Sequence, residues 1–143
     1  MRLPSIPVRP MTVADLPAAL DLWRQTEGLG LGESDTPPAL TAFLERNPGM
    51  SCVALSPEGG LAGAVLCGDD GRRGYLHHLA VARAQRRRGI ARALLAHCFA
   101  ELAARRIPKC NIFLLAGNAE GERFWLREGW QSRGDLRVLQ KPV

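Results

Sequence analysis

Three consecutive arginines (residues 86–88) and the glycine after them, Gly89, are the residues of this sequence best suited to bind an anion. The apolar run before them, residues 79–81, predicts a strand, and the amphipathic spacing from Ile90 onward predicts a helix. A helix N-terminus presents unpaired N–H groups and a partial positive charge. Glycine lets a ligand approach that backbone, and arginine adds cationic donors. The turn is therefore predicted to bind phosphate, and in particular a diphosphate.

The spacing Arg-x-x-Gly-x-Ala over residues 86–91 resembles the acetyl-CoA signature of the GNAT N-acetyltransferases, because a Leu-Ala-Val strand precedes it and a leucine-rich helix follows. A second motif is similar to the family's N-x-x-A-x-x-F/L-Y-x-x-x-G-F, and it reads Asn118-x-x-Gly121-x-x-Phe124-Trp125-x-x-x-Gly129-Trp130. The predicted order of elements is also that of the family, so the resemblance covers nearly the whole chain. The chain is expected to be a small member of the bacterial, single-domain type.

The resemblance implies acetyl-CoA as co-substrate. The backbone on either side of Ala80, at Leu79 and Val81, would bind the pantetheine arm and so extend the sheet. The arginine turn would bind the pyrophosphate. Its residues are Arg86, Arg87, Arg88, Gly89, Ile90, Ala91 and Arg92. In the last helix Asn118, Phe124 and Trp125 would contact the pantetheine; alternatively, Asn118 only caps that helix.

Trp125 departs from the family pattern, which usually has a tyrosine at this position. That tyrosine typically lies near the cofactor sulfur and can protonate the leaving thiolate. An indole N–H donates a hydrogen bond but is not a usable acid. Either the thiolate leaves without this help, or another residue or water supplies the proton. Trp125 can also simply pack, against the pantetheine or in the core.

A general base is needed as well, because attack on a thioester requires a neutral amine. The candidates on the predicted strand are Tyr75, His77 and His78. Strict alternation places residues 75, 77, 79 and 81 on one face and residues 76, 78 and 80 on the other, so the two histidines are expected to point in opposite directions. Glu33 and Asp35, in the loop over residues 28–38, are further candidates. Their simpler role is that of a solvated loop or a helix cap.

The strand after the central helix carries Phe113 where some N-terminal-amine acetyltransferases have a glutamate, which argues against that subclass. Adjacent histidines are a poor metal signature, and no metal is expected. The four cysteines form no C-x-x-C pair and lie in apolar segments, which favours reduced, buried thiols in a reducing compartment.

Hydrophobic periodicity predicts the element order β-α-α-β-β-β-α-β-α-β. The resemblance to the family implies that these elements form an α/β (α+β) fold of the GNAT type. Strands are expected at residues 6–9, 50–55, 61–67, 74–81, 110–115 and 130–139. Helices are expected at about residues 12–27, 37–44, 90–106 and 119–128. The strand–helix–strand unit over residues 74–115 should be parallel and the hairpins antiparallel. The result is a mixed, mostly antiparallel sheet of six to seven strands with helices on both faces, in a single domain over residues 1–143.

Composition narrows the function. The chain has 143 residues, 46% of them hydrophobic, and a net charge of +5 that is concentrated in the arginine-rich segment over residues 72–92. Such a basic patch implies an anionic partner. The N-terminus lacks the apolar core of a signal peptide and no run is long enough to span a membrane, so a cytoplasmic protein without membrane association is expected. A homodimer is plausible because exposed strand edges are often covered by a partner.

These observations together favour an N-acetyltransferase that transfers an acetyl group from acetyl-CoA to a primary amine of a small molecule or a protein, by direct attack in a ternary complex. The alternative is a GNAT-fold module that binds an acyl-CoA as a sensor or regulator without transfer. A nucleic-acid-binding module is disfavoured, because the arginine cluster lacks interleaved aromatic residues.

Overall fold

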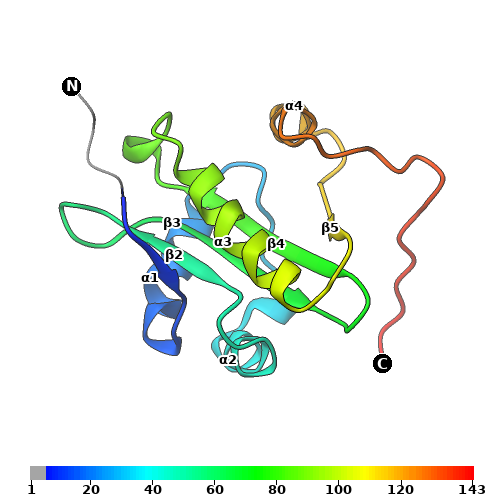
Figure 1. The fold of residues 1–143 in the computed structure, drawn as a ribbon, viewed down its shortest axis with the longest axis horizontal. Coiled ribbons are helices and arrows are strands. Elements are labelled where there is room, and N and C mark those ends of the chain that lie inside the picture. The colour runs from blue at the N-terminus through cyan, green and yellow to red at the C-terminus, as the bar shows by residue number, and fades with distance from the viewer. Residues whose placement is uncertain (1–5) are drawn as a thin grey trace. The chain divides into compact units, whose positions relative to one another are not determined.

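The computed structural model describes residues 6–143, which separate into two compact units divided between Phe113 and Leu114. The first unit holds a sheet and three α-helices (Figure 1). Its strands are β1 (Val8–Pro10), β2 (Cys52–Leu55), β3 (Leu61–Asp69), β4 (Gly74–Val81) and β5 (Cys110–Ile112). Its α-helices are α1 (Leu16–Arg24), α2 (Pro37–Arg46) and α3 (Ile90–Ala104), and the second unit holds α4 (Ala119–Arg127). The expectation of a single domain stays a prediction.

The five strands form one sheet in the order β1-β2-β3-β4-β5. The first four pair antiparallel, and β4 pairs parallel with β5. The predicted α/β fold with a mixed, mostly antiparallel sheet is therefore confirmed, although the sheet has five strands instead of the six to seven expected.

The strand predicted over residues 130–139 is wrong. A bend at Arg133–Asp135, where Leu136 N–H donates to the Arg133 carbonyl (3.3 Å), divides that stretch. Arg133 also pairs with Asp135 across the bend. The apolar residues at the end of the stretch, Leu136, Val138 and Leu139, are exposed. Alternation alone does not make a strand without a partner that completes the ladder of hydrogen bonds.

Helices cover both faces of the sheet, as predicted. Figure 1 shows α3 lying across the front of the sheet. Gly63 of β3 lies against this helix, whereas its neighbour Ala64 belongs to the core that α1 and α2 build on the opposite face. Trp23 of α1 is fully buried in that second core. Because both faces are covered, the interior residues of β3 are buried throughout, as expected for a central strand between two layers of helix.

The helix boundaries follow local chemistry. Thr36 caps α2, with its hydroxyl accepting a hydrogen bond from Ala39 N–H (3.3 Å), and prolines occupy the first turn. Asn118 caps α4 in the same way. No helix among residues 6–143 has both the length and the apolar character needed to cross a membrane.

Candidate active site

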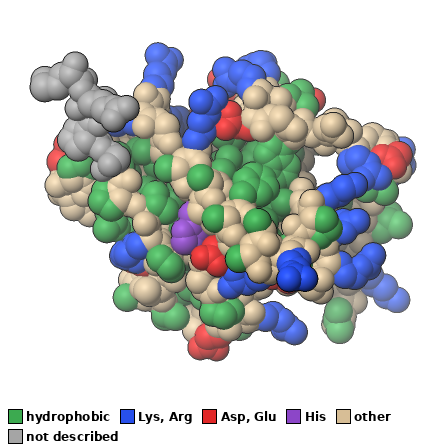
Figure 2. Space-filling model, viewed as in Figure 1, with side chains coloured by type: hydrophobic (Ala, Val, Ile, Leu, Met, Phe, Trp, Pro, Cys, Tyr) green, Lys and Arg blue, Asp and Glu red, His purple; other side chains and the backbone are tan. Residues whose placement is uncertain are grey.

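The arginine turn before α3 has the backbone of an anion site. Arg87 and Gly89 both adopt left-handed conformations, with φ of 67° and 76°. Gly89 is the N-cap residue of the fifteen-residue helix α3, and it has no side chain that could accept a hydrogen bond from the first-turn N–H groups. The first-turn N–H groups thus keep the positive end of the helix dipole accessible. Figure 2 shows Lys and Arg side chains projecting from the surface near this loop. The turn therefore fits a phosphate-bearing ligand.

Side chains of the same region brace this turn. The buried Gln85 accepts a hydrogen bond from Arg88 (3.0 Å) and donates one to the Ser56 hydroxyl (3.3 Å). Arg86 donates from Nε to the Val81 carbonyl (3.1 Å), and its guanidinium lies 3.9 Å from the Glu27 carboxylate. Two of the three arginines therefore hold the backbone of the turn. The Val81 carbonyl retains one further lone pair for a ligand.

A β-bulge in β4 changes which residues share a face. His77 pairs with Leu66 and Ala80 pairs with Ala64, so two residues of β4 stand opposite one residue of β3. The bulged residue is His78, with φ of 59°. The expectation that strict alternation sends His77 and His78 to opposite sides is therefore wrong, and both line the same cavity. Ala80 likewise shares the face of His77 instead of opposing it, because directly paired residues point to the same side.

The two neighbours of β4 diverge at the bulge. β5 pairs with β4 only from Gly74 to Leu76, while β4 continues to Val81 along β3. Within the first unit, residues 77–81 thus have no strand paired on the β5 side. This open edge ends beside the arginine turn, and it is the place where the sequence predicts the pantetheine arm.

The cavity beside the histidines has a volume of about 590 Å³. Its walls come from the loop before α2, from α2 itself and from the adjacent faces of β3 and β4. The lining residues are Glu33, Ser34, Asp35, Ala39, Leu40, Ala42, Phe43, Arg46, Leu66, His77 and His78. The cavity is thus largely apolar, with acidic, basic and imidazole groups among its walls, as is usual for a small-molecule site.

An imidazole–carboxylate pair forms one wall of the cavity. His78 Nε2 lies 2.7 Å from Asp35 Oδ1, and both side chains are mostly buried. The other carboxylate oxygen of Asp35 accepts a hydrogen bond from Gly32 N–H (2.8 Å). The His78 ring also packs on Trp23, with ring centroids 5.2 Å apart. The ring is therefore fixed from two sides.

The neighbouring aromatic rings set the environment of His77. This ring stacks on Phe113 with centroids 6.2 Å apart, and it meets Phe43 edge-on at 6.0 Å. Burial lowers the pKa of His77, and the adjacent His78 lowers it further. Tyr75 also stacks on Phe113, with ring centroids 6.1 Å apart.

The structure brings some of the predicted residues together and leaves others apart. Glu33 and His77 line one cavity, and Tyr75 lies next to it through Phe113. Trp125 belongs to the second unit, where it packs between Phe124 and Trp130. Sequence reasoning missed the lining residues of α2, whose apolar spacing indicates only a core-facing helix. It also did not favour the pair of Asp35 with His78, which lie 43 residues apart in the chain.

Asn118 has a clear local role in the second unit. Its side-chain oxygen accepts a hydrogen bond from Gly121 N–H (3.0 Å), so it caps α4. A Cβ at Gly121 would come within 2.6 Å of the Asn118 amide nitrogen. The glycine that replaces the family's alanine thus makes room for this cap. Among residues 6–143 no group of three or more His, Cys, Asp or Glu side chains is placed to hold a metal ion.

Comparison with known proteins agrees with this fold. A family model described as the acetyltransferase (GNAT) family matches residues 16–130. An acetyltransferase of Pectobacterium atrosepticum is 32% identical over 104 residues, which is 73% of this chain and 72% of that protein. The PaiA N-acetyltransferase of Thermoplasma acidophilum, solved in complex with coenzyme A, superposes with a TM-score of 0.78 at 16% identity, over 92% of this chain and 94% of that one. Ard1 of Thermoplasma volcanium superposes with a TM-score of 0.76 at 14% identity, over 88% and 82% of the two chains.

The chain therefore belongs to the acetyltransferase (GNAT) family, and it is an acyltransferase. Membership of the family implies acetyl-CoA as the acyl donor. The solved structures share too little sequence with this chain to show more than the common fold.

Proposed function

We propose that this protein is an N-acetyltransferase that transfers an acetyl group from acetyl-CoA to a primary amine. The observation that carries the proposal is the open edge of β4, which runs from the cavity at His77 to the arginine turn before α3. A donor lying along this edge would have its diphosphate at one end and its thioester at the other. The acceptor amine would enter from the cavity.

The protein's share of this chemistry is orientation and charge stabilisation. The backbone of Leu79 and Val81 would hold the pantetheine arm, and the N–H groups of residues 87–91 would hold the pyrophosphate. The Leu79 N–H, next to the bulge, would donate to the thioester oxygen as negative charge develops there. Holding amine and thioester together makes the attack effectively unimolecular.

Direct attack by the amine is favoured over an acetylated enzyme. None of the residues lining the cavity is a cysteine. Cys52, Cys67 and Cys98 are fully buried between sheet and helix, and the pKa of Cys98 is raised by its hydrogen bond with Cys52 and by burial. The thiolate is the nucleophilic form of cysteine. A covalent intermediate on these thiols is therefore not part of the proposal.

The acceptor is proposed to be a cationic amine with an apolar portion. Glu33 and Asp35 bring carboxylates to the cavity, while Leu40, Phe43 and Leu66 bring apolar surface. Such a site favours a protonated amine on a hydrocarbon stem, whether from a small molecule or a lysine side chain. The roles implied for Asn118, Phe124 and Trp125 as pantetheine contacts stay predictions, as does the departure of the thiolate without a tyrosine.

Release of free coenzyme A thiol from acetyl-CoA, measured against a panel of polyamines, aminoglycosides and lysine peptides, tests the proposal. Amine-dependent release with an N-acetylated product found by mass spectrometry is the expected result. Binding of acetyl-CoA in calorimetry without turnover of any amine would instead support a sensor that binds the donor only.

A further inference from the structure

The bulge of β4 and the loop before α2 form a contact that family membership does not assign. His78 occupies the bulge in a left-handed conformation, with φ of 59°. Residues with a Cβ are disfavoured in this region because the Cβ crowds the following carbonyl oxygen. Strained residues persist where the surrounding structure holds them, and they cluster at functional sites. His78, in this conformation, lines the cavity together with His77.

The imidazole is held in a defined orientation. Its Nε2 lies 2.7 Å from Asp35 Oδ1, and Gly32 N–H fixes the second carboxylate oxygen at 2.8 Å. A carboxylate only accepts hydrogen bonds, so in the neutral imidazole Nε2 carries the proton and Nδ1 keeps its lone pair. The ring face rests on Trp23, a fully buried side chain. The contacts thus select one tautomer and one ring orientation, as a general base requires.

We propose that His78 is the general base of the proposed transfer and that Asp35 is its positioning residue. The inference rests on the proposed function and names the group that activates the acceptor. The acceptor ammonium gives a proton to Nδ1 of His78, and its nitrogen then attacks the thioester carbonyl carbon. The C–N bond forms, and the C–S bond breaks with its electron pair on sulfur. The new amide nitrogen loses its second proton to solvent, His78 passes its proton to solvent, and the thiolate takes one proton back, so that one proton is released per transfer.

The neighbouring candidates fit this role less well. His77 is enclosed by Phe43 and Phe113, and burial lowers its pKa, so it is a weaker proton acceptor. Tyr75 stacks on Phe113 and has no imidazole-like basicity. Glu33 lines the cavity, but within residues 6–143 no hydrogen bond or ion pair fixes its carboxylate. His78 combines exposure to the cavity with a fixed orientation.

The decisive variant is His78→Asn. Asparagine tolerates a positive φ and can still donate a hydrogen bond to Asp35, but it is not a base. The variant should lose about 100-fold or more in kcat while the KM for acetyl-CoA and the binding of CoA in calorimetry stay unchanged. The matched control is His97→Asn, on α3, where the ring contacts the Gly49 carbonyl away from the cavity. It should keep wild-type kcat.

A second variant separates lost chemistry from lost folding. His78→Gly relieves the strained backbone, and it leaves space for a free imidazole. Added imidazole should restore part of kcat in this variant, by about tenfold, and should restore nothing in Asp35→Asn. For Asp35→Asn we expect a fall of about tenfold or more in kcat with an unchanged KM for acetyl-CoA, because the ring loses its fixed tautomer.

Nitrogen-15 spectra of the histidine rings give a readout that does not depend on turnover. In the wild type the proton of His78 should lie on Nε2, and Asp35→Asn should produce a mixture of tautomers. A proton on Nδ1 in the wild type would overturn the proposal. A His78→Asn variant that keeps kcat within threefold of the wild type would also overturn it, as would one that raises only the KM of the amine. In either case the His78–Asp35 pair would only hold the loop before α2 in place. A wild type that transfers acetyl to no amine refutes the proposed function instead.

Discussion

Gly63 of β3 lies directly beneath Ile90, the first residue of α3. A Cβ at Gly63 would come within 3.2 Å of the Ile90 side chain, 3.0 Å of Leu94 and 3.0 Å of the Ala80 carbonyl oxygen. The first turn of α3 can therefore approach the sheet closely only because residue 63 has no side chain. Since the arginine turn leads into that helical turn, this contact sets the position of the proposed diphosphate site.

Gly63→Val should push the N-terminal end of α3 away from the sheet. The backbone oxygen of Ala80 cannot yield as a flexible side chain would, so we expect a loss of about 2 kcal/mol in the free energy of unfolding. The displaced helix should also bind acetyl-CoA several-fold more weakly. Denaturant unfolding and calorimetry measure the two effects. Gly134→Val, at a position where a Cβ meets nothing within 4 Å, is the control and should change neither.

Replacement of Gly89 tests the turn itself. A Cβ at Gly89 meets no atom within 4 Å, so its φ of 76° is the only obstacle to a side chain. Gly89→Val should cost about 1–2 kcal/mol of stability and should also weaken acetyl-CoA binding by tenfold or more, because a branched residue cannot keep the left-handed conformation. Gly89→Asn should do less, since asparagine tolerates this region.

Gly71 provides the matched control for that experiment. It lies in the turn between β3 and β4 with φ of 88°, and a Cβ there also meets open space. Gly71→Val should thus lose a similar amount of stability while binding acetyl-CoA as the wild type does. Equal loss of binding in both variants would show that Gly89 acts only through folding.

Most of the elements were predictable because each has its own local signal. The central helix, for example, follows from the spacing of Ile90, Leu94, Leu95, Cys98 and Leu102, all of which are buried on one side of α3. The arginine turn was predictable because its residue types specify both a bend and a positive charge. The glycine at residue 89 indicates an N-cap with a positive φ, and Gly89 has a φ of 76°.

The face of β4 that lines the cavity was not predictable in the same way. The bulge at His78 arises from the pairing of β4 with β3, and nothing in the order of residues 74–81 marks it, since the residue in the left-handed position is not glycine. The partner of His78 lies 43 residues away, so only the folded chain shows the pair. The prediction of a last strand was wrong for the converse reason, because the apolar residues at 136–139 suggest a strand but have no strand within residues 6–143 paired with them.

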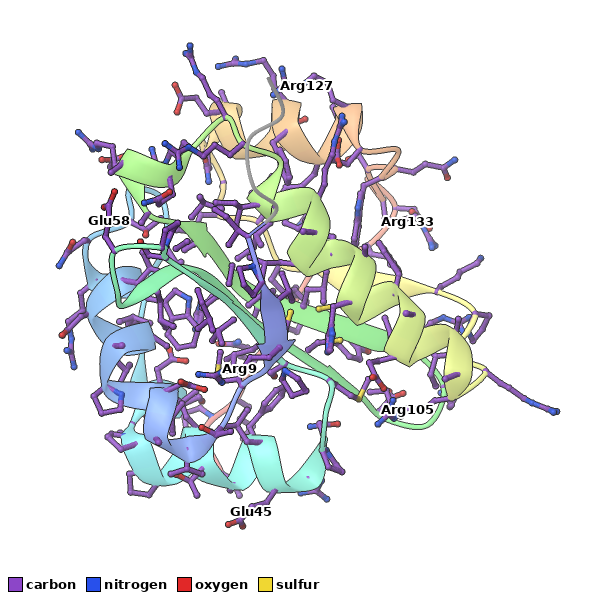
Figure 3. The ribbon with its side chains drawn as sticks, turned by 60° about the vertical axis from the view of Figure 1, so that its left-hand side comes forward. Arg9, Glu45, Glu58, Arg105, Arg127 and Arg133 are labelled. Carbon is purple, nitrogen blue, oxygen red and sulfur yellow. The ribbon has the colours of Figure 1, made fainter. Side chains whose placement is uncertain are left out.

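The Arg9–Asp15 pair should make stability depend on acid pH. Arg9 of β1, labelled in Figure 3, donates two hydrogen bonds to the carboxylate of Asp15, at 2.7 and 2.8 Å. These bonds, together with those from Thr12, lower the pKa of Asp15 to about 2. Asp15→Asn should therefore lose about 1–2 kcal/mol of unfolding free energy at pH 7, a value that allows for the partial exposure of Arg9.

The sign of this pH effect follows from the direction of the shift. A lowered pKa stabilises the fold above the pKa of the unfolded carboxyl, near 3.8, and the contribution is lost as the pH falls toward about 2. The difference between wild type and Asp15→Asn should therefore shrink below pH 4 and vanish near pH 2 in urea titrations. Asp21→Asn removes an exposed pair with Arg24 and should have no measurable effect. A difference that grows at low pH would contradict the assignment.

The cysteines should behave as packing residues and not as nucleophiles. Cys52 and Cys98 lie between β2 and α3 with their sulfur atoms 3.9 Å apart, and both are fully buried. Cys110 is half-buried, and burial raises the pKa of its thiol to about 12. Iodoacetamide at pH 8 should thus modify Cys110 slowly and the other three thiols only after unfolding, because the thiolate is the reactive form. Mass spectrometry of the native and denatured chains identifies the modified positions.

The same labelling distinguishes direct transfer from an acetylated enzyme. Incubation with acetyl-CoA in the absence of an amine should leave every cysteine without an acetyl group, and native iodoacetamide treatment should leave the rate of transfer unchanged. Cys52→Ala would remove a sulfur packed against Cys98 and would cost stability through the small cavity it opens, without affecting kcat. A stoichiometric acetyl group on Cys52, Cys67 or Cys98 would show instead that α3 separates from the sheet during turnover, since these thiols have no other route to the donor.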